Sequence, residues 1–310
     1  MAEREPLSSH AIADILSSFV DTGRNLLDIA ENESRHGSLQ EFIQKKISIE
    51  NPKCLLGLIE AGAEMYKRMS LKTKTEAETT WKRAYHCAEV QEAVENYFQL
   101  GVQWDAFLEK LDSMLEMSDK AHVQPARFLP SDVSLVDART GETLMLGKYL
   151  GRGEKILLVL IRQFSCLLCR IHLNDLQTKQ AALDAHGVRV VVVSFGCQEG
   201  ALHWLKETGC QYDLLLDPHR NIYTLFGLGA SLTRVLNFNN MLLYADYILS
   251  DHEFPRPLPS IQDDMFQLGG DFVLDEQGKV MFSHRCKSPI DRPAVEEILS
   301  ALNTTNLSTA

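Results

Sequence analysis

The sequence predicts an α/β domain built on a buried parallel sheet and preceded by an all-α helical bundle. Residues 1–125 carry apolar side chains at spacings of three and four throughout, which is the helical period. Over residues 128–302, short Val/Ile/Leu-rich runs alternate with helical patterns, which is the order expected of an α/β layer. The predicted boundary lies within 124–131, and residues 303–310 are expected to form a frayed tail.

The length and composition are those of an ordinary globular protein. The chain has 310 residues, of which 45% are hydrophobic and 24% charged. Its formal net charge of −11 disfavours nucleic acid and anionic membranes as partners, because both need a basic surface. No apolar run reaches the ~20 residues that span a bilayer, and the N-terminus resembles neither a signal nor a transit peptide. We therefore expect a cytoplasmic protein with no membrane span.

The first part of the chain predicts a bundle of four or five helices. Residues 11–30 form the first apolar stripe, and Ser38 with Glu41 forms a capping box at the start of the next helix. A long helical pattern covers residues 75–117, and Gly101 is expected to interrupt it. No catalytic constellation is visible in this part, which leaves a protein partner as its candidate role.

The second part predicts strands and helices in alternation. A short strand at 133–136 comes first, and three strands follow that read as buried on both faces because of their Val, Ile and Leu content. Glycine-containing turn residues within 271–284 indicate a terminal hairpin. The three buried strands are expected at 155–164, 188–194 and 212–216, and the helices after the last two of them and after the hairpin at 198–207, 221–226 and 293–302.

A Cys-x-x-Cys pair, Cys166 and Cys169, follows the first buried strand directly and precedes a helical pattern. The pair therefore lies at a strand-to-helix junction, with Cys166 near the helix N-terminus. Unpaired backbone N–H groups and the positive end of the helix dipole favour a thiolate over a thiol there. A thioredoxin-type dithiol is built in this way.

The two cysteines have different expected roles. Cys166 is expected to be the nucleophile and the more exposed thiol, and Cys169, one turn later, the resolving thiol. Attack by Cys166 gives a mixed disulfide or a sulfenate, which Cys169 then displaces to close the pair. Two intervening residues on one helical turn allow the short Cα separation that a disulfide needs.

Five further residues are candidates for assisting the dithiol, and for four of them an ordinary structural role is the alternative. Arg162 and Arg170 flank the pair and either stabilise the Cys166 thiolate or are solvated charges, and Ser165 directly precedes Cys166. His172 is a candidate proton donor, although its place in the helical pattern favours a surface histidine. Cys197 follows the strand 188–194 and is expected at the same sheet edge, as a third exchange partner or a buried loop cysteine.

Two other interpretations of the dithiol stay open, a pair of inert half-buried thiols and half of a zinc site. Zinc needs a second ligand pair. Cys197 and Cys210 are separately placed, and neither Cys54 nor His86-Cys87 supplies such a pair. Redox chemistry is therefore the favoured interpretation, and ordinary packing is expected for the cysteines of the helical part.

An insertion at 227–268 separates the predicted helix at 221–226 from the terminal hairpin, and it is rich in apolar and aromatic residues. One hypothesis is that it forms an apolar wall or lid beside the dithiol and helps to select the substrate. The alternative is a packing layer or a dimer surface.

Four motifs accompany the Cys-x-x-Cys in the second part of the chain: Phe195-Gly-Cys, Gly227-Leu-Gly, Gln267-Leu-Gly-Gly-Asp-Phe-Val-Leu-Asp and Asp291-Arg-Pro. Over residues 128–300 the chain resembles the peroxiredoxin-like branch of the thioredoxin-fold superfamily, the AhpC/TSA-type antioxidant proteins, and within it selenoprotein L, whose paired selenocysteines have the spacing of Cys166 and Cys169. The resemblance implies an α/β thioredoxin-like (peroxiredoxin-like) domain and thiol redox chemistry. No bound cofactor is expected, and electrons are expected from a thioredoxin or glutathione system.

Departures from the family pattern narrow the function. Gln163 stands where a peroxiredoxin has the Thr that orients the peroxide, which disfavours direct peroxidase activity, and Leu167-Leu168 replaces the Gly-Pro of thioredoxin. The first hypothesis is a thiol oxidoreductase acting on a protein or small-molecule thiol, disulfide or peroxide. The alternatives are a reductase of a lipid endoperoxide of the prostaglandin type, and a non-enzymatic redox sensor or adaptor that binds a protein through residues 1–125.

Overall fold

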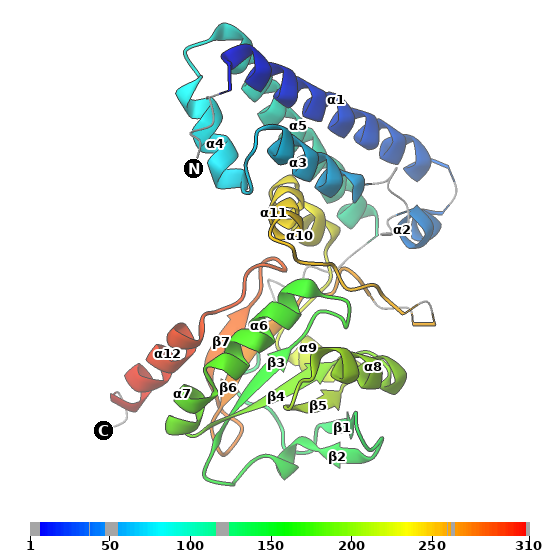
Figure 1. The fold of residues 1–310 in the computed structure, drawn as a ribbon. Coiled ribbons are helices and arrows are strands. Elements are labelled where there is room, and N and C mark those ends of the chain that lie inside the picture. The colour runs from blue at the N-terminus through cyan, green and yellow to red at the C-terminus, as the bar shows by residue number, and fades with distance from the viewer. Residues whose placement is uncertain are drawn as a thin grey trace. The chain divides into compact units, whose positions relative to one another are not determined.

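The computed structural model divides the chain into two compact units, drawn as a ribbon in Figure 1. One unit is helical and consists of Met1–Glu116 and Val235–Glu253; the other consists of Met117–Arg234 and Phe254–Ala310 and contains the sheet. The residues described are 7–36, 38–46, 55–115, 124–258, 260–261 and 264–307.

The helical unit follows from amphipathic helices with well-formed starts. The Ser8 hydroxyl accepts a hydrogen bond from the Ala11 N–H at 3.2 Å, and Thr73 with Glu76 forms a complete capping box. Apolar residues at helical spacing, such as Leu16 and Phe19, are buried. The predicted helical first part is confirmed; its helices are α1 (Ser9–Ser34), α2 (Leu39–Lys46), α3 (Gly57–Arg68), α4 (Lys74–Arg83) and α5 (Ala88–Met114).

Gly101 does not interrupt its helix, and that prediction is wrong. Helix α5 continues through this position to Met114. A β-carbon at Gly101 would lie 2.9 Å from Cδ1 of Phe238, so the glycine permits close packing by an aromatic ring. The break occurs earlier, between α4 and α5 at Ala84–Cys87, where the sequence pattern was continuous.

Part of the insertion, Val235–Glu253, belongs to the helical unit, so this unit consists of two separate stretches of the chain. Helix α11 (Phe238–Leu249) packs against α3 and α5, and the Trp104 indole N–H donates to the Leu236 carbonyl at 2.9 Å. This arrangement corresponds to the packing-layer alternative for the central part of the insertion. Its two ends meet in the sheet unit, where the Leu268 N–H donates to Gly229 and the Ser231 N–H to Phe266.

Replacing Phe238 by Ala is expected to destabilise the helical unit by about 3–5 kcal/mol, the usual cost of emptying a packed aromatic site. The ring is 7% exposed, and its centroid lies 5.1 Å from that of Tyr97 and 6.1 Å from that of Phe19. Peptide-level hydrogen exchange should show faster exchange in α1 and α5. The change Phe98→Ala on the exposed face of α5 is the matched control, and equal effects of the two changes would contradict the packing role.

The sheet unit is a seven-stranded mixed sheet in the order β2-β1-β5-β4-β3-β6-β7. The central strands β3, β4 and β5 are parallel; β1 joins antiparallel to β5, and β6 antiparallel to β3. The Val-rich β4 matches its predicted range, because β-branched residues suit a strand buried on both faces. The strands are β1 (Ser134–Asp137), β2 (Thr143–Met145), β3 (Lys155–Leu160), β4 (Val188–Ser194), β5 (Asp213–Leu216), β6 (Gly270–Leu274) and β7 (Val280–Arg285).

The helices of this unit connect and cover the strands. The predicted helices at 198–207 and 221–226 are present as α8 and α9, and α12 continues the last predicted helix into the expected tail. In sequence order the helices are α6 (Leu167–Thr178), α7 (Gln180–Ala185), α8 (Gln198–Thr208), α9 (Asn221–Leu225), α10 (Leu232–Leu236) and α12 (Val295–Leu307), with a 3-10 turn at Leu146–Lys148.

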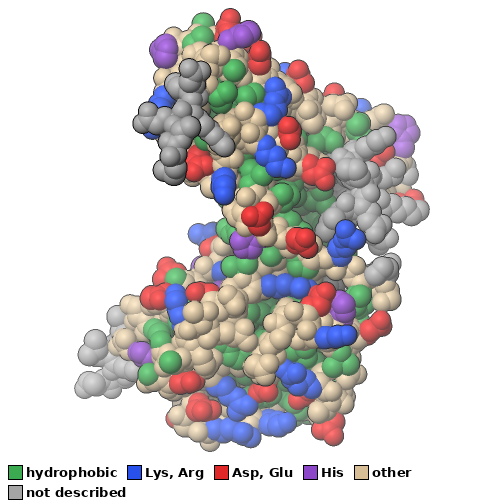
Figure 2. All heavy atoms as spheres, in the orientation of Figure 1, with side chains coloured by type: hydrophobic (Ala, Val, Ile, Leu, Met, Phe, Trp, Pro, Cys, Tyr) green, Lys and Arg blue, Asp and Glu red, His purple; other side chains and the backbone are tan. Residues whose placement is uncertain are grey.

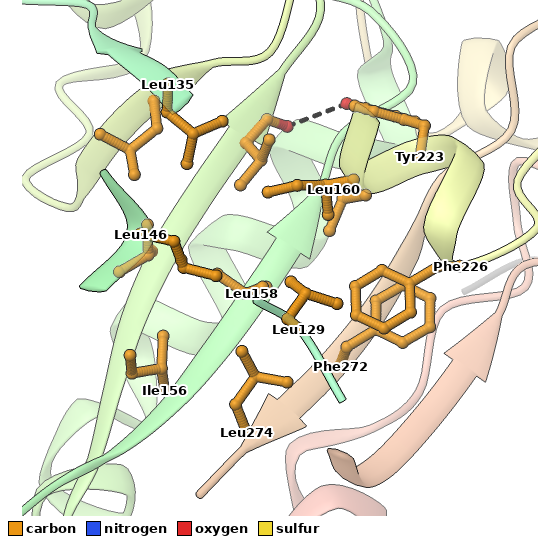
Figure 3. Close-up of a cluster of buried hydrophobic side chains, with 14 of the residues drawn as sticks. Leu129, Leu135, Leu146, Ile156, Leu158, Leu160, Tyr223, Phe226, Phe272 and Leu274 are labelled. Atoms are coloured by element: carbon orange, nitrogen blue, oxygen red, sulfur yellow. Dashed lines mark hydrogen bonds between the residues drawn. The ribbon is translucent and has the colours of Figure 1, made fainter. Parts of the chain in front are cut away.

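The core on one face of the sheet lies beneath the edge that carries the dithiol. Figure 3 shows Ile156, Leu158 and Leu160, alternate residues of β3, in one cluster with Tyr223 of α9 and with Phe226, whose ring stacks on that of Phe272. The Tyr223 hydroxyl donates to the Ile161 carbonyl at 2.7 Å and to the Val193 carbonyl at 3.0 Å. This side chain therefore ties together the carboxyl ends of β3 and β4, where the functional residues follow.

Acidic and basic side chains are interspersed over the face of the molecule seen in Figure 2. Among the residues that the structure describes, no helix is long and apolar enough to cross a membrane.

Candidate functional site

Cys166 and Cys169 lie at the junction between β3 and α6, at disulfide distance from each other. Their Cα atoms are 5.3 Å apart. Cys166 is the N-cap of α6, and its sulfur accepts a hydrogen bond from the Cys169 N–H at 3.2 Å. The sulfur thus takes the place of a capping oxygen, which is where negative charge is stabilised by a helix N-terminus.

Both cysteines are buried, contrary to the expectation that Cys166 is exposed. Cys166 is 3% exposed and Cys169 is 1% exposed. The two leucines between them, Leu167 and Leu168, are also buried, at 8% and 7%. Apolar residues at both intervening positions draw the first turn of α6 into the protein, which buries both thiols with it.

Phe164, two residues before Cys166, anchors the loop that carries the dithiol. A β-carbon at Gly196 would overlap the Phe164 ring, and one at Gly200 would lie 2.8 Å from it. The ring therefore packs against two positions without side chains at the start of α8, and its centroid is 6.2 Å from that of Trp204. The Phe195-Gly-Cys motif thus serves to seat the dithiol loop.

Replacing Gly196 by Ala is expected to displace Phe164 and cost about 1–3 kcal/mol, as overpacking usually does. Because Phe164 precedes the dithiol, the rate of Cys166–Cys169 disulfide formation should fall as well. Thermal unfolding and alkylation after oxidation by glutathione disulfide would measure both effects. The change Leu202→Ala at an exposed position of α8 should alter neither, and unchanged disulfide formation in Gly196→Ala would contradict the anchoring role.

Of the predicted accessory residues, Arg162 contacts the dithiol. Its Nη1 lies 3.8 Å from the Cys166 sulfur, and its backbone N–H donates to the Cys169 sulfur at 3.4 Å. The guanidinium is 4% exposed and is held in place by the carbonyls of Gln267, at 3.0 Å, and Met265. Arg162 is therefore a buried charge directed at the Cys166 sulfur, and it is not a solvated charge on the surface.

Arg170 and Ser165 have no such contact. Arg170 donates to the Phe164 carbonyl at 3.0 Å and to Glu207 at 2.8 Å, and this hydrogen bond lowers the pKa of the Glu207 carboxyl. Arg170 therefore braces the loop from outside. Ser165 is half-buried and lines a shallow depression that also includes Arg256 and Ile261.

Cys197 is an exposed free thiol immediately before α8. Its loop lies at the sheet edge of the dithiol, as predicted, because Gly196 packs on Phe164. Cys210 and Cys286 are buried, and burial raises the pKa of both, that of Cys286 to about 12. Cys54 lies outside the described residues, and within the described ones no group of three His, Cys, Asp or Glu side chains is placed to hold a metal ion.

A buried charge network behind Cys169 was missed in the sequence. His172 is 6% exposed, and its Nε2 lies 2.8 Å from Asp271, so the expectation of a surface histidine is wrong. Asp271, on β6, also accepts from Arg292 at 2.8 Å, and Arg292 Nη2 lies 3.6 Å from the Cys169 sulfur. The signal was present, since Asp271 and Arg292 lie inside the quoted motifs, but linear spacing does not show that they meet.

The pKa of Asp271 reflects this network. Burial of the carboxyl would by itself raise its pKa, but the charges of His172 and Arg292 and their hydrogen bonds outweigh burial and lower the pKa to about 2. Asp271 is therefore an anion under physiological conditions, and it holds two basic side chains on the Cys169 side of the dithiol.

Comparisons with known proteins identify the family of this chain. A family model described as AhpC/TSA antioxidant enzyme matches residues 175–288, a stretch that begins after the dithiol. A prostamide/prostaglandin F synthase of Sus scrofa is 30% identical over 176 residues, which are 54% of this chain and 83% of that protein. The chain belongs to the peroxiredoxin-like AhpC/TSA family.

Other members of the peroxiredoxin-like family are also similar. Human peroxiredoxin-like 2C is 24% identical over 191 residues, covering 60% of this chain and 84% of that protein. Among solved structures, Enterococcus faecalis AhpC has a TM-score of 0.42 and 16% identity, and covers 60% of this chain and 94% of its own. The family, with a cysteine pair at disulfide distance, supports redox thiol chemistry.

Proposed function

We propose that this protein is a thiol–disulfide oxidoreductase in which Cys166 and Cys169 cycle between a dithiol and a disulfide. The observation that carries the proposal is that the Arg162 guanidinium and the N-terminus of α6 both lie beside the Cys166 sulfur. Arg162 lies 3.8 Å from the Cys166 sulfur, and the N–H of Cys169 donates to the same atom. Both features stabilise a thiolate, which is the reactive form of cysteine.

The reaction proceeds by two successive exchanges. The Cys166 thiolate attacks one sulfur of a substrate disulfide, the substrate S–S bond breaks, and the first substrate thiolate leaves. Cys169 as a thiolate then attacks the Cys166 sulfur, which releases the second substrate thiolate and closes the pair. The two leaving thiolates take up the protons that the two cysteines lost, and the substrate disulfide has gained two electrons.

Return to the dithiol needs a reductant, and we propose a thioredoxin or glutathione system. Both systems operate in the cytoplasm, the compartment expected from the sequence. The regulatory or antioxidant substrate is a thiol, a disulfide or a peroxide, because these are the groups that a dithiol exchanges with.

The test is a redox titration of the purified protein in glutathione buffers. Alkylation and mass spectrometry measure the fraction of the protein that contains the Cys166–Cys169 disulfide. We expect a reversible two-electron transition at about −200 to −300 mV. The double variant Cys166→Ser, Cys169→Ser reports the background from the other cysteines. A pair that never closes under any buffer would remove the enzymatic proposal and favour the adaptor.

A second candidate is the reduction of a lipid endoperoxide. The favouring observation is the 30% identity to a protein named prostamide/prostaglandin F synthase. In that reaction the O–O bond would break, two hydroxyl groups would form, and the dithiol would supply two electrons and two protons as it closes. Incubating the reduced protein with a prostaglandin endoperoxide and measuring both the diol and the Cys166–Cys169 disulfide distinguishes the candidates, since a disulfide reductase without this activity gives neither.

A further inference from the structure

Each sulfur of the dithiol has an arginine of its own, and the second arginine comes from a distant part of the chain. Arg162 faces Cys166, whereas Arg292, just before α12, places Nη2 3.6 Å from the Cys169 sulfur. The same Nη2 donates to the Leu160 carbonyl at 3.0 Å, and Nη1 donates to Asp271 at 2.8 Å. The Arg292 side chain is 6% exposed, so this guanidinium is fixed at the bottom of the site.

The fold makes room for Arg292 at one glycine. A β-carbon at Gly269 would lie 2.6 Å from Nη2 of Arg292 and would overlap the Leu160 carbonyl oxygen. In addition, the Nε–H of Arg292 is buried without a hydrogen-bond partner in the described part of the chain. The guanidinium therefore keeps capacity to stabilise further negative charge beside it.

We propose that Arg292 is a catalytic residue for the second exchange, in which it stabilises the thiolate of Cys169, and that Asp271 and His172 are positioning residues that hold Arg292 there. This inference rests on the proposed function. The step is the attack of the Cys169 thiolate on the Cys166 sulfur of the mixed disulfide, in which the bond to the substrate sulfur breaks and a substrate thiolate leaves. Arg292 increases the rate at neutral pH because it increases the fraction of Cys169 that is ionised, and the thiolate is the form that attacks.

Five charged or titratable side chains from different elements surround Cys169. Arg162 follows β3, His172 lies on α6, Asp271 on β6, Cys286 follows β7, and Arg292 precedes α12. Asp271 is the carboxylate that contacts Arg292 and His172, and it is an anion above a pH of about 2. Cys286 stays a neutral thiol over the working range, because burial raises its pKa to about 12. Asp291, next to Arg292, pairs with His284 at 3.1 Å.

The test is a rapid-quench reaction of the reduced full-length protein with glutathione disulfide, analysed by mass spectrometry for glutathione on Cys166. In the wild type the mixed disulfide should be transient. In Arg292→Met it should persist at least tenfold longer at pH 7, and the rate of resolution should rise at higher pH than in the wild type. Arg292→Lys, which keeps the charge, should recover part of the rate, and Arg189→Met, at the amino-terminal end of β4 and so at the opposite end of the strands from the dithiol, should behave as wild type. Resolution in Arg292→Met at the wild-type rate and with the wild-type pH profile would overturn the inference.

A second measurement does not depend on turnover or on the methionine variant folding. In a Cys166→Ser background, the absorbance of the Cys169 thiolate at 240 nm is followed against pH, with Cys166→Ser, Cys169→Ser subtracted. Adding Arg292→Lys should move this titration to higher pH, because lysine cannot make all three contacts at once; an unchanged titration overturns the inference. If the wild type forms neither the mixed disulfide nor the closed pair, the proposed function fails, and this titration still decides the role of Arg292.

Discussion

Replacing Cys166 by Ser is expected to abolish disulfide exchange, a loss of roughly a thousandfold or more, because the hydroxyl of serine is a far weaker nucleophile than the thiolate that the proposed reaction needs. Replacing Cys169 by Ser is expected to leave the first exchange intact and to stop the second. The two variants therefore differ in kind: the first forms no adduct, and the second accumulates a mixed disulfide on Cys166.

Mass spectrometry after reaction with glutathione disulfide measures this difference directly. Cys87→Ser is the matched control, because Cys87 is a half-buried free thiol in the helical unit and its side chain makes no capping hydrogen bond. An adduct on Cys169 in the Cys166→Ser variant, formed at the wild-type rate, would reverse the assignment of nucleophile and resolving thiol. In the same assay, Cys197→Ser tests the third-partner hypothesis: unchanged turnover and unchanged intermediates would remove it.

The second large effect is expected from Asp271→Asn, which should destabilise the sheet unit by about 3–5 kcal/mol. The carboxylate is fully buried and bonded to two basic side chains, His172 and Arg292. An amide of the same shape leaves the charge of Arg292 buried without its anion, and this uncompensated charge is the source of the cost. Hydrogen exchange of β3 and β6 peptides measures the loss in the unit concerned.

The same carboxylate predicts the direction of a pH effect. Its folded-state pKa of about 2 lies below the ordinary value near ~3.9, so ionised Asp271 contributes about 2 kcal/mol of stability at neutral pH. That contribution is complete above pH ~4 and is lost as the pH falls toward 2. Asp271→Asn should lack this part of the acid dependence. Asp213→Asn, which breaks a half-exposed pair with Arg189, should cost under about 1 kcal/mol, and equal losses in the two variants would contradict the buried-network account.

The sequence predicted those features that are local along the chain. The dithiol at a strand-to-helix junction, the Val-rich β4 and the capping residues all follow from neighbouring residues, and the structure has them where expected. The prediction that Gly101 interrupts its helix was wrong because the neighbouring residues look the same in two cases: a glycine that ends a helix, and a glycine inside a helix that leaves room for a ring such as that of Phe238. That difference depends on a residue 137 positions later in the chain.

The charge network could not be predicted for a similar reason. His172, Asp271 and Arg292 come from α6, β6 and the loop before α12, and only the pairing of β3 with β6 brings Asp271 opposite Val159. The helical pattern around His172 is the same for a histidine on the surface and for a buried histidine that is paired with a carboxylate. The pattern therefore could not show that His172 is buried against Asp271. The burial of Cys166 is also a tertiary property, and the spacing of the two cysteines does not contain it.

The interrupted course of the helical unit has a consequence for biosynthesis. Its last helix, α11, follows β5 in the chain, so a ribosome has already released β3, β4 and β5 before the helical unit can be complete. The sheet unit is completed later still, because β6, the antiparallel neighbour of β3, is synthesised after α11. During synthesis the nascent chain therefore carries two unfinished units at once, with the apolar surfaces of α3 and α5 awaiting α11. We expect nascent chains that end before residue 238 to engage chaperones more strongly than those that extend beyond residue 285.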